Sequence, residues 1–322
     1  MMALNYEYLL TLQLLDGIGN KTIFKIIEQI SVPIDSVEQL CEFWVSLKGK
    51  KFQNITPEEI IRANKLAKHL ISEAEENEVG IISFFDANFP DQLRQCKDEK
   101  GKLDPPLILF YRGNLKVMGK KGLAIIGTRE PTENGKNAGL FFSEEFAKRG
   151  FNIISGLAVG CDTTAHFGAL NVNGATTAFL ATGLDWESIY PKENLDLAKE
   201  IVSNGGLLLS EYPVGSRCGV YSLVARDRLQ AGLANATLVI QTGVNGGTMH
   251  AVNATIASDK PLFSVHFKND EDRTHEKVQG NLFLIQEKGA FPLRSNGIDS
   301  AISIINNACV QKVKLSQPSL FD

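Results

Sequence analysis

The sequence predicts an α/β protein whose main domain is a Rossmann-like, doubly wound and mostly parallel sheet, preceded by a small helical domain. After residue 122, short apolar segments alternate with segments whose apolar residues recur four positions apart, which is the order of strand, crossover helix and next parallel strand. Glycine-rich loops follow several of these apolar segments, and in open α/β sheets such loops lie where ligands bind. The chain has 322 residues, 43% of them apolar, which is enough for one sizeable core and an accessory domain.

Composition narrows the classes of protein to be considered. A formal net charge of −4 excludes a surface that is basic all over, so a nucleic-acid site must be a local patch. The five cysteines are an odd number without Cys-x-x-Cys spacing, which argues against a disulfide framework and a zinc site. No basic segment followed by an apolar one stands at the amino terminus, and no apolar run approaches the roughly 20 residues that span a bilayer. We therefore expect a cytoplasmic protein with no membrane partner.

Residues 1–80 are expected to form the small domain, of the helix-hairpin-helix or SAM-like kind. Apolar residues recur at helical spacing on both sides of the segment Asp-Gly-Ile-Gly-Asn. Gly17 and Gly19 permit a tight connection, and the unit is compatible equally with binding a DNA phosphate and with merely turning a corner. A further helix is expected after Thr56, which can cap it, with Pro57 in the first helical position.

Residues 81–307 are assigned to the main domain. Its first part, 81–114, contains a short apolar strand, a charged loop and a second strand, LILFY, and is interpreted as a connector. The strands expected in the sheet are 123–127, 151–156, 175–183, 206–212, 236–243 and 261–267. Amphipathic helices between them should cover both faces of the sheet. Residues 308–322 are polar and are expected to be a disordered tail.

The predicted DNA- or phosphate-binding residues lie in loops that follow the expected strands. Glycine lets the backbone approach a ligand, the amides at a helix start attract an anion, and an arginine nearby can pair with phosphate. The residues singled out in this way are Gly127, Thr128, Arg129, Ser155, Gly156, Gly246, Gly247 and Thr248. The loops have no GxGxxG spacing, and GxxxxGK[ST] does not occur, so no nucleotide cofactor is expected.

Catalytic patterns are missing from the sequence. The five histidines form no HExxH or His-x-x-x-His pair, and Gly-x-Ser-x-Gly does not occur, so we expect neither a metal centre nor catalytic residues. Asp162 and His166 lie one helical turn apart, and an acid–base pair or a simple helix cap accounts for them equally well. His250 is expected to be a packed residue rather than a base. The chain is therefore not expected to be an enzyme.

Three longer motifs carry a resemblance to a known family. They are IISGLAVGCDTTAHFGAL at 153–170, ATGLDWESIYPKEN at 181–194 and LLLSEYPVGS at 207–216. In this order and spacing they resemble the signature of the DprA/Smf DNA-processing family, a Rossmann-like family of the LOG/SLOG superfamily. The resemblance implies a protein that binds and protects single-stranded DNA, forms a homodimer and delivers the strand to a RecA-type recombinase. The implied setting is DNA uptake and transformation, recombination or the handling of foreign DNA.

The resemblance also implies two further DNA contacts. The family's Phe-Pro-x-Arg-Asn-Arg run stands here as LVARDR at 223–228, so Arg226 and Arg228 are kept as phosphate partners. The alternative is a pair of surface salt bridges near a helix start. Asp227 replaces the asparagine between the arginines, and its charge is expected to lower the local positive potential and with it the affinity for DNA.

A second hypothesis is a LOG-like nucleotide sensor or nucleotide-processing protein. The acidic pI, the altered arginine run and the Gly246-Gly247-Thr248 loop favour it. A free nucleotide needs only one pocket, whereas DNA needs a groove that continues between pockets. Met249 and His250 stand where phosphoribohydrolases of that superfamily carry catalytic acids, which argues against glycosidic hydrolysis.

The C-terminal peptide adds one more expected partner. Gln317, Leu320 and Phe321 fit the short Gln-x-x-Leu-Phe pattern by which bacterial replication and repair proteins dock on the sliding clamp. A disordered peptide with one polar and two apolar anchors is suited to a preformed groove. The resemblance of this tail therefore implies binding to the sliding clamp.

Overall fold

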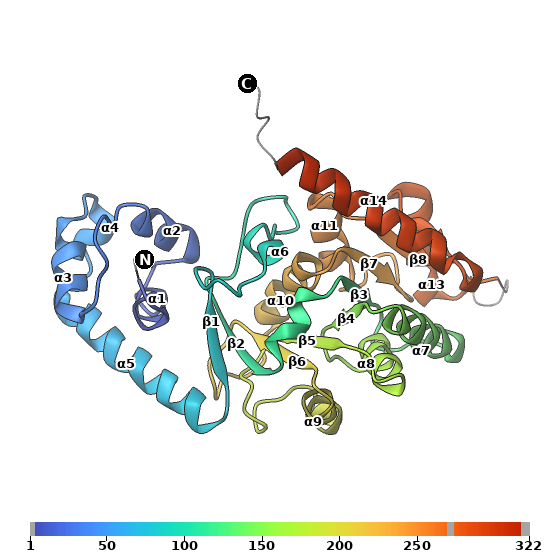
Figure 1. The fold of residues 1–322 in the computed structure, drawn as a ribbon, viewed down its shortest axis with the longest axis horizontal. Coiled ribbons are helices and arrows are strands. Elements are labelled where there is room, and N and C mark those ends of the chain that lie inside the picture. Colours follow the sequence, from blue (N-terminus) through green and yellow to red (C-terminus); the bar gives the residue numbers. More distant parts are fainter. Residues whose placement is uncertain (1–3, 269–273, 317–322) are drawn as a thin grey trace.

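The computed structural model describes residues 4–268 and 274–316. It confirms an α/β protein, with a helical domain at one end of the molecule (Figure 1). The helices of that domain are α1 Tyr6–Gln13, α2 Asn20–Ile27, α3 Val37–Ser46, α4 Lys50–Gln53 and α5 Pro57–Glu76. 

Local sequence accounts for how these helices begin and turn. α5 begins with a capping box, in which Thr56 Oγ1 accepts from Glu59 N and the Glu59 carboxylate accepts from Thr56 N. The connection between α1 and α2 passes through Gly17 at φ +70°, a conformation that favours glycine. The expected helix, glycine turn and helix are therefore confirmed.

The described residues form one nine-stranded sheet in the order β1-β2-β6-β5-β4-β3-β7-β8-β9. Its strands are β1 Gly80–Ser83, β2 Ile108–Gly113, β3 Gly122–Ile126, β4 Asn152–Ser155, β5 Thr176–Leu180, β6 Leu207–Ser210, β7 Ala236–Val239, β8 Leu262–Val265 and β9 Phe291–Leu293. β3 to β9 run parallel, and the direction of the strand order reverses between β3 and β7. The six strands expected in the sheet are confirmed.

The interpretation of residues 81–114 as a connector is wrong. β1 pairs antiparallel with β2, and β2 pairs antiparallel with β6, so both extend the sheet at its edge. The pattern of a short apolar segment does not show which strand supplies its hydrogen bonds. β9 was not expected, because it has only three residues and contains Pro292. A proline is tolerated there because β9 is an edge strand of the sheet.

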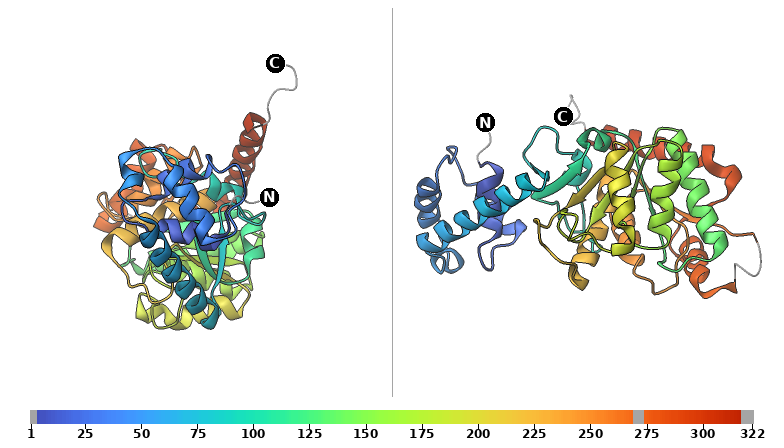
Figure 2. Two further views of the ribbon diagram at one scale, coloured as in Figure 1. Left: turned by 90° about the vertical axis from the view of Figure 1, so that its left-hand side faces the viewer. Right: turned by 90° about the horizontal axis from the view of Figure 1, so that it is seen from below.

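Helices cover both faces of the sheet, as the side-chain alternation along β3 illustrates. Leu123 and Ile125 pack in one cluster with Phe146 of α7 Glu133–Lys148, while Ala124 packs on the opposite face with Leu229. Figure 2 shows this layered arrangement from two further sides. The remaining helices are α6 Asp91–Arg94, α8 Cys161–Asn171, α9 Leu195–Ser203, α10 Val220–Leu233, α11 Met249–Ala257, α13 Glu276–Glu287 and α14 Ile298–Ser316. Short 3-10 helices span Leu115–Gly119, Lys192–Asn194 and Ser295–Gly297.

The prediction of a disordered tail from residue 308 is wrong for residues 308–316, which belong to α14. Ile298, Ala301 and Ile305 anchor the start of this helix in the core, and its polar last turns continue the same hydrogen-bonded backbone. The expected clamp-binding residues Gln317, Leu320 and Phe321 lie outside the described residues. In the ranges 4–268 and 274–316, no helix is both long and apolar enough to cross a membrane.

Candidate nucleic-acid interface

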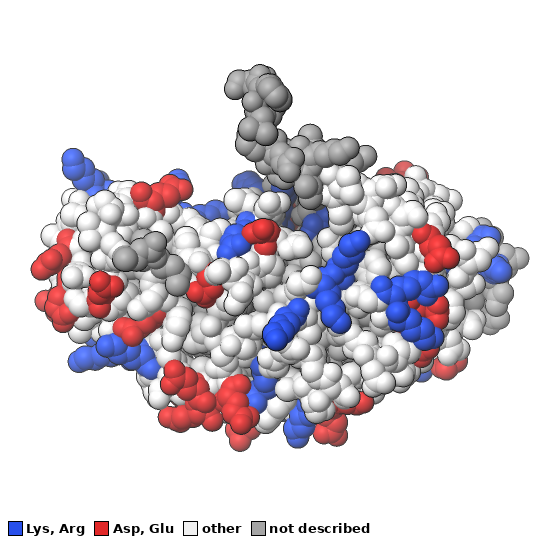
Figure 3. Space-filling view, in the orientation of Figure 1, with Lys and Arg blue, Asp and Glu red and all other residues white. Residues whose placement is uncertain are grey.

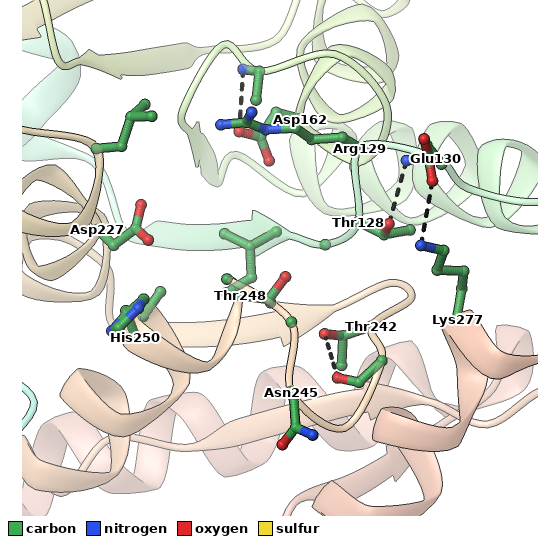
Figure 4. A pocket seen from close by; sticks show the side chains of 18 of the residues that line it. Thr128, Arg129, Glu130, Asp162, Asp227, Thr242, Asn245, Thr248, His250 and Lys277 are labelled. Atoms are coloured by element: carbon green, nitrogen blue, oxygen red, sulfur yellow. Dashed lines mark hydrogen bonds and ion pairs between the residues drawn. The ribbon is translucent and has the colours of Figure 1, made fainter. Parts of the chain in front are cut away.

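A cavity of about 770 Å³ opens at the carboxyl ends of β3 and β7, where the strand order reverses. The loops after β3, β4 and β7 and residues of α10, α11 and α13 line it (Figure 4). This is the position at which open α/β sheets bind ligands. The volume is suited to a ligand of nucleotide size or larger.

The loop after β3 is held rigidly and presents Arg129 to the cavity. Thr128 N donates to Gln241 O at 2.7 Å, and Cys161 N donates to Thr128 O at 3.1 Å. A Cβ at Gly127 would stand 2.6 Å from Cys161 Sγ, so only glycine lets the loop pack this closely. Arg129 itself is exposed and, among the described residues, has no ion-pair partner. The sequence-predicted residues 127–129 therefore line the cavity.

The loop after β4 serves mainly to support the site. Asp162 Oδ2 accepts from Gly156 N at 3.1 Å and from Ala158 N at 3.2 Å, so this carboxylate holds the loop in place. His166 is fully buried and its Nδ1 lies 2.7 Å from Thr176 Oγ1; burial lowers the pKa of His166 to about 3. The two side chains thus have separate partners and form no acid–base pair. Asp162 does not cap its helix either, because it binds the preceding loop and the N-cap of α8, Gly160, has no side-chain hydrogen bond. Ser155 is buried as well, donating to Ile125 O at 2.6 Å.

The loop after β7 forms the opposite wall of the cavity. Gly246, Gly247 and Thr248 line the cavity just before α11, as the sequence predicts. A Cβ at Gly246 would lie 2.9 Å from Thr242 Oγ1, whereas a Cβ at Gly247 would meet no atom within 4 Å. The close packing that requires glycine therefore concerns Gly246, and Gly247 faces open space.

Arg226 lines the cavity, but its guanidinium group is occupied by the protein itself. The residue is 5% exposed; Nη1 donates to Gly156 O at 2.5 Å and to Phe179 O at 2.8 Å. Nε lies 3.1 Å from Asp227 Oδ1. A Cβ at Gly156 would stand 1.7 Å from Arg226 Nη1, which explains the glycine at that position. Arg226 is thus a buried clamp between α10 and the ends of β4 and β5, rather than the exposed phosphate partner expected from the sequence.

Arg228 points away from the cavity. Its Nη1 and Nη2 donate to the two carboxylate oxygens of Glu211, each at 2.8 Å, and its Nε lies 2.6 Å from Asp104 Oδ2. The side chain is 10% exposed, so these are largely buried ion pairs rather than the surface salt bridges of the alternative interpretation. The expectation that Arg228 offers a free cation at the site is therefore not met in this structure.

Two acidic side chains, Asp227 and Asp162, line one part of the cavity, and the sequence had offered Asp227 only as a charge that weakens DNA binding. Burial raises the pKa of Asp227 to about 6, against a lowering by Arg226, and burial also raises the pKa of Asp162. His250 Nδ1 lies 2.7 Å from Glu99 Oε2 beside them. Figure 4 shows Asp227 and His250 at one end and Lys277 at the other, where Lys277 pairs with Glu130 at 3.2 Å. Asp162 and Asp227 stand in motifs of the sequence and Glu99 does not, and only the fold brings these residues of separate elements near one another.

A second cavity, of about 160 Å³, adjoins the first. The residues that line both cavities are Arg129, Ala158, Leu223 and Arg226. Tyr190 and Pro191 lie in its wall, and Tyr190 is 47% exposed. Gly156, predicted from the sequence, lines this second cavity.

The outer surface and the titratable groups add two observations. Figure 3 shows acidic and basic side chains interspersed over the face that Figure 1 presents, in keeping with the net charge of −4. Among the residues that the structure describes, no group of three or more His, Cys, Asp or Glu side chains is placed to hold a metal ion.

The model of a protein family, DNA recombination-mediator protein A, matches residues 80–303 of this chain. Among curated relatives, protein Smf from Synechocystis sp. is 36% identical over 212 residues, which are 62% of this chain and 52% of the relative. DNA processing protein DprA from Bacillus subtilis is 31% identical over 167 residues, 52% of this chain and 55% of the relative. The chain thus spans about half the length of the curated relatives it matches.

Two solved structures resemble the fold. The X-ray structure of DNA processing protein A from Streptococcus pneumoniae has a TM-score of 0.70 at 24% identity, covering 89% of this chain and 93% of that one. DNA processing protein A from Helicobacter pylori has a TM-score of 0.58 at 26% identity, covering 70% of this chain and 95% of that one. The Helicobacter structure gives insight into a single-stranded DNA binding mode of that protein.

Proposed function

This chain belongs to the DNA recombination-mediator protein A family, and from that premise we propose that it binds single-stranded DNA across its two adjoining cavities. Membership confirms the resemblance seen in the motif series. The proposal is a binding function: the strand is held and handed on, without a bond being made or broken in it. The single-stranded DNA binding mode described for the Helicobacter pylori protein supports it.

The observation that carries the proposal is that the two cavities adjoin. Four residues line both, so the larger space at β3 and β7 and the smaller one beside Tyr190 share a wall. A single nucleotide would occupy only one of the two cavities. A DNA strand can occupy both, because its successive nucleotides can bind in neighbouring cavities.

Arg129 stands at the junction of the two cavities as an exposed cation. Because it has no ion-pair partner among the described residues, a phosphate can bind it without breaking a salt bridge. Charged hydrogen bonds from arginine to phosphate are among the strong contacts in proteins. Tyr190 offers an aromatic face in the smaller cavity, on which a base can stack.

The family also suggests two partners for this function, a RecA-type recombinase that receives the strand and a second copy of this chain in a homodimer. The tail residues Gln317, Leu320 and Phe321 suggest a third, the sliding clamp, and all three remain proposals. So do a cytoplasmic location and a part in transformation, recombination or defence. The nucleotide-sensor hypothesis is the competing proposal, and the length dependence of binding separates the two.

Fluorescence anisotropy of a labelled oligothymidylate of about 16 nucleotides tests the proposal across a salt series. We expect salt-sensitive binding by the wild type and, for Arg129→Ala, a loss of about tenfold in affinity with a salt slope lower by about one charge. Arg62→Ala, which removes an exposed arginine from α5, is the matched control and should bind as the wild type does.

Unlabelled competitors decide between the two hypotheses. Longer strands should compete better than short ones, and thymidine monophosphate should compete poorly. If the strand does not bind at low salt while a mononucleotide does, the DNA function is overturned in favour of the nucleotide sensor.

A further inference from the structure

The side chain of Asp227 lies at the end of the larger cavity. Its carboxylate can accept more hydrogen bonds than the described residues of the protein donate to it. It projects from α10, is 18% exposed, and lines the cavity (Figure 4). The contacts described for it are made by Oδ1, which accepts from Gln230 Nε2 at 3.1 Å and lies 3.1 Å from Arg226 Nε. An ionised carboxylate has about four acceptor positions, so Oδ2 and part of Oδ1 remain for a ligand.

The protein holds this carboxylate in place at a cost. Gln230 is 2% exposed and donates its amide to Asp227, which leaves Gln230 Oε1 buried without a hydrogen-bond partner among the described residues. A buried acceptor without a partner is unfavourable, so the arrangement is not one that stability alone favours. Gln230 is thus a positioning residue that turns the carboxylate of Asp227 toward the cavity.

An anionic acceptor at this end decides which part of a nucleotide can lie there. A phosphate is repelled by Asp227 and finds its cation at Arg129 or Lys277, further along the cavity in Figure 4. The base of that nucleotide then lies at the Asp227 end of the cavity. Because an ionised carboxylate only accepts hydrogen bonds, the edge of the base that faces Asp227 must donate them. Guanine has two adjacent donors, N1–H and the 2-amino group, which match the two oxygens of a carboxylate. On the same edge, adenine and cytosine each have one amino donor next to an acceptor, and thymine has one donor between two acceptors. None of these three bases offers the carboxylate two adjacent donors.

We propose that Asp227 makes this cavity a guanine-reading site, its carboxylate accepting hydrogen bonds from N1–H and the 2-amino group of one guanine in the bound strand. The inference rests on the proposed single-stranded DNA function, and adds a base preference to it. Asp227 is the residue that determines the preference, and Gln230 and Arg226 position it.

The test compares two labelled strands on the full chain: an oligothymidylate, and the same strand with one central guanine. Wild type should bind the guanine strand about tenfold more tightly, the size of one bidentate base contact. Replacing that guanine by hypoxanthine, which lacks the 2-amino group, should remove a large part of the preference. In Asp227→Asn the preference should fall to within about twofold, while the oligothymidylate binds more tightly because a negative charge has been removed.

Asp196→Asn is the matched control, since it removes an exposed carboxylate from α9, outside the lining of both cavities, and should leave the guanine preference unchanged. Failure of both strands to bind wild type would overturn the proposed function itself. Equal binding of both strands by wild type would overturn only the guanine site. Equal loss of both strands in folded Asp227→Asn would also overturn it, because Asp227 would then merely support Arg226. If deoxyguanosine monophosphate competes as well as the guanine strand does, the base site stands and its ligand is a free guanine nucleotide.

Discussion

Three consecutive residues, Arg226, Asp227 and Arg228, show how differently neighbouring charges are used. Arg226 donates to two backbone carbonyls, Asp227 faces the cavity, and Arg228 is held by Glu211 and Asp104. The residue types predicted the charge of all three side chains, but not which of them a ligand could reach. Only Asp227 keeps capacity to bind a ligand, although the sequence comparison cast it as the residue that weakens DNA binding.

At the residue scale, the guanine preference should depend on pH. Burial raises the pKa of Asp227 to about 6; the groups facing it are Arg226 on α10, Asp162 on α8, His250 on α11 and Arg129 after β3. The ionised form is the double acceptor, so the preference is complete well above pH 6 and is lost as the pH falls through that value. Anisotropy at about pH 7.5 and about pH 5 should show the ratio of the two affinities falling toward one.

Asp227→Asn is the control for this pH series, because its two affinities should keep a constant ratio. Thymine strands should bind wild type more tightly at the lower pH, since protonation removes a negative charge. A preference that grows on acidification would contradict the assignment of Asp227 as an acceptor.

Two glycines singled out by the sequence should differ sharply when replaced by alanine. In Gly156→Ala the new Cβ would stand 1.7 Å from Arg226 Nη1 and 2.7 Å from Asp162 Oδ2, whereas in Gly247→Ala it meets nothing within 4 Å. We expect Gly156→Ala to lower the free energy of unfolding by about 1–3 kcal/mol through overpacking. Gly247→Ala should change it by less than about 0.5 kcal/mol. Urea unfolding measures both, and equal effects would contradict the packing described for Gly156.

At the scale of the element, α10 explains why the arginine run misled. An α-helix has about 3.6 residues per turn, so each residue is rotated by about 100° from the one before it. Arg226 and Arg228 are therefore about 200° apart around the axis of α10 and cannot both face one cavity. Arg226 joins α10 to the ends of β4 and β5, and Arg228 joins it to Glu211 after β6 and to Asp104 before β2. Charges adjacent in the sequence are therefore spread around the helix.

Arg228→Met should accordingly act on stability rather than on DNA. Removing the cation leaves Glu211 and Asp104 without their partner in a largely buried place, and we expect a loss of about 3 kcal/mol in the free energy of unfolding. The affinity of the folded variant for the strand should stay within twofold of wild type. Wild-type stability combined with weakened DNA binding would instead restore Arg228 as a phosphate partner.

At the scale of the whole molecule, the helical domain and the sheet share one core. Leu9 of α1 and Ile60 of α5 belong to the same apolar cluster as Leu208 of β6. Arg112 of β2 is buried at this junction, donating to Leu184 O at 3.1 Å, with its guanidinium 4.4 Å from the centre of the Trp186 ring. The hairpin glycines lie in this helical domain rather than in the cavity at β3 and β7 (Figure 1). The corner-turning alternative for Gly17 therefore agrees with the structure.

The sequence by itself determined the alternation of strands and helices, the six main strands, the start of α5 and the loops that line the cavity at residues 127–129 and 246–248. These features depend on periodicity, on glycine and on capping residues, all of which act between neighbours in the chain. The motif series likewise identified the family. Only the tertiary structure decided that β1, β2 and β9 complete the sheet, that α14 continues to Ser316, and which charged groups are free. Burial and pairing depend on residues far apart in the sequence. Arg228 is occupied because Asp104 and Glu211 are brought to it, whereas Arg129 is available because no acidic side chain of the described residues lies within ion-pair distance of it.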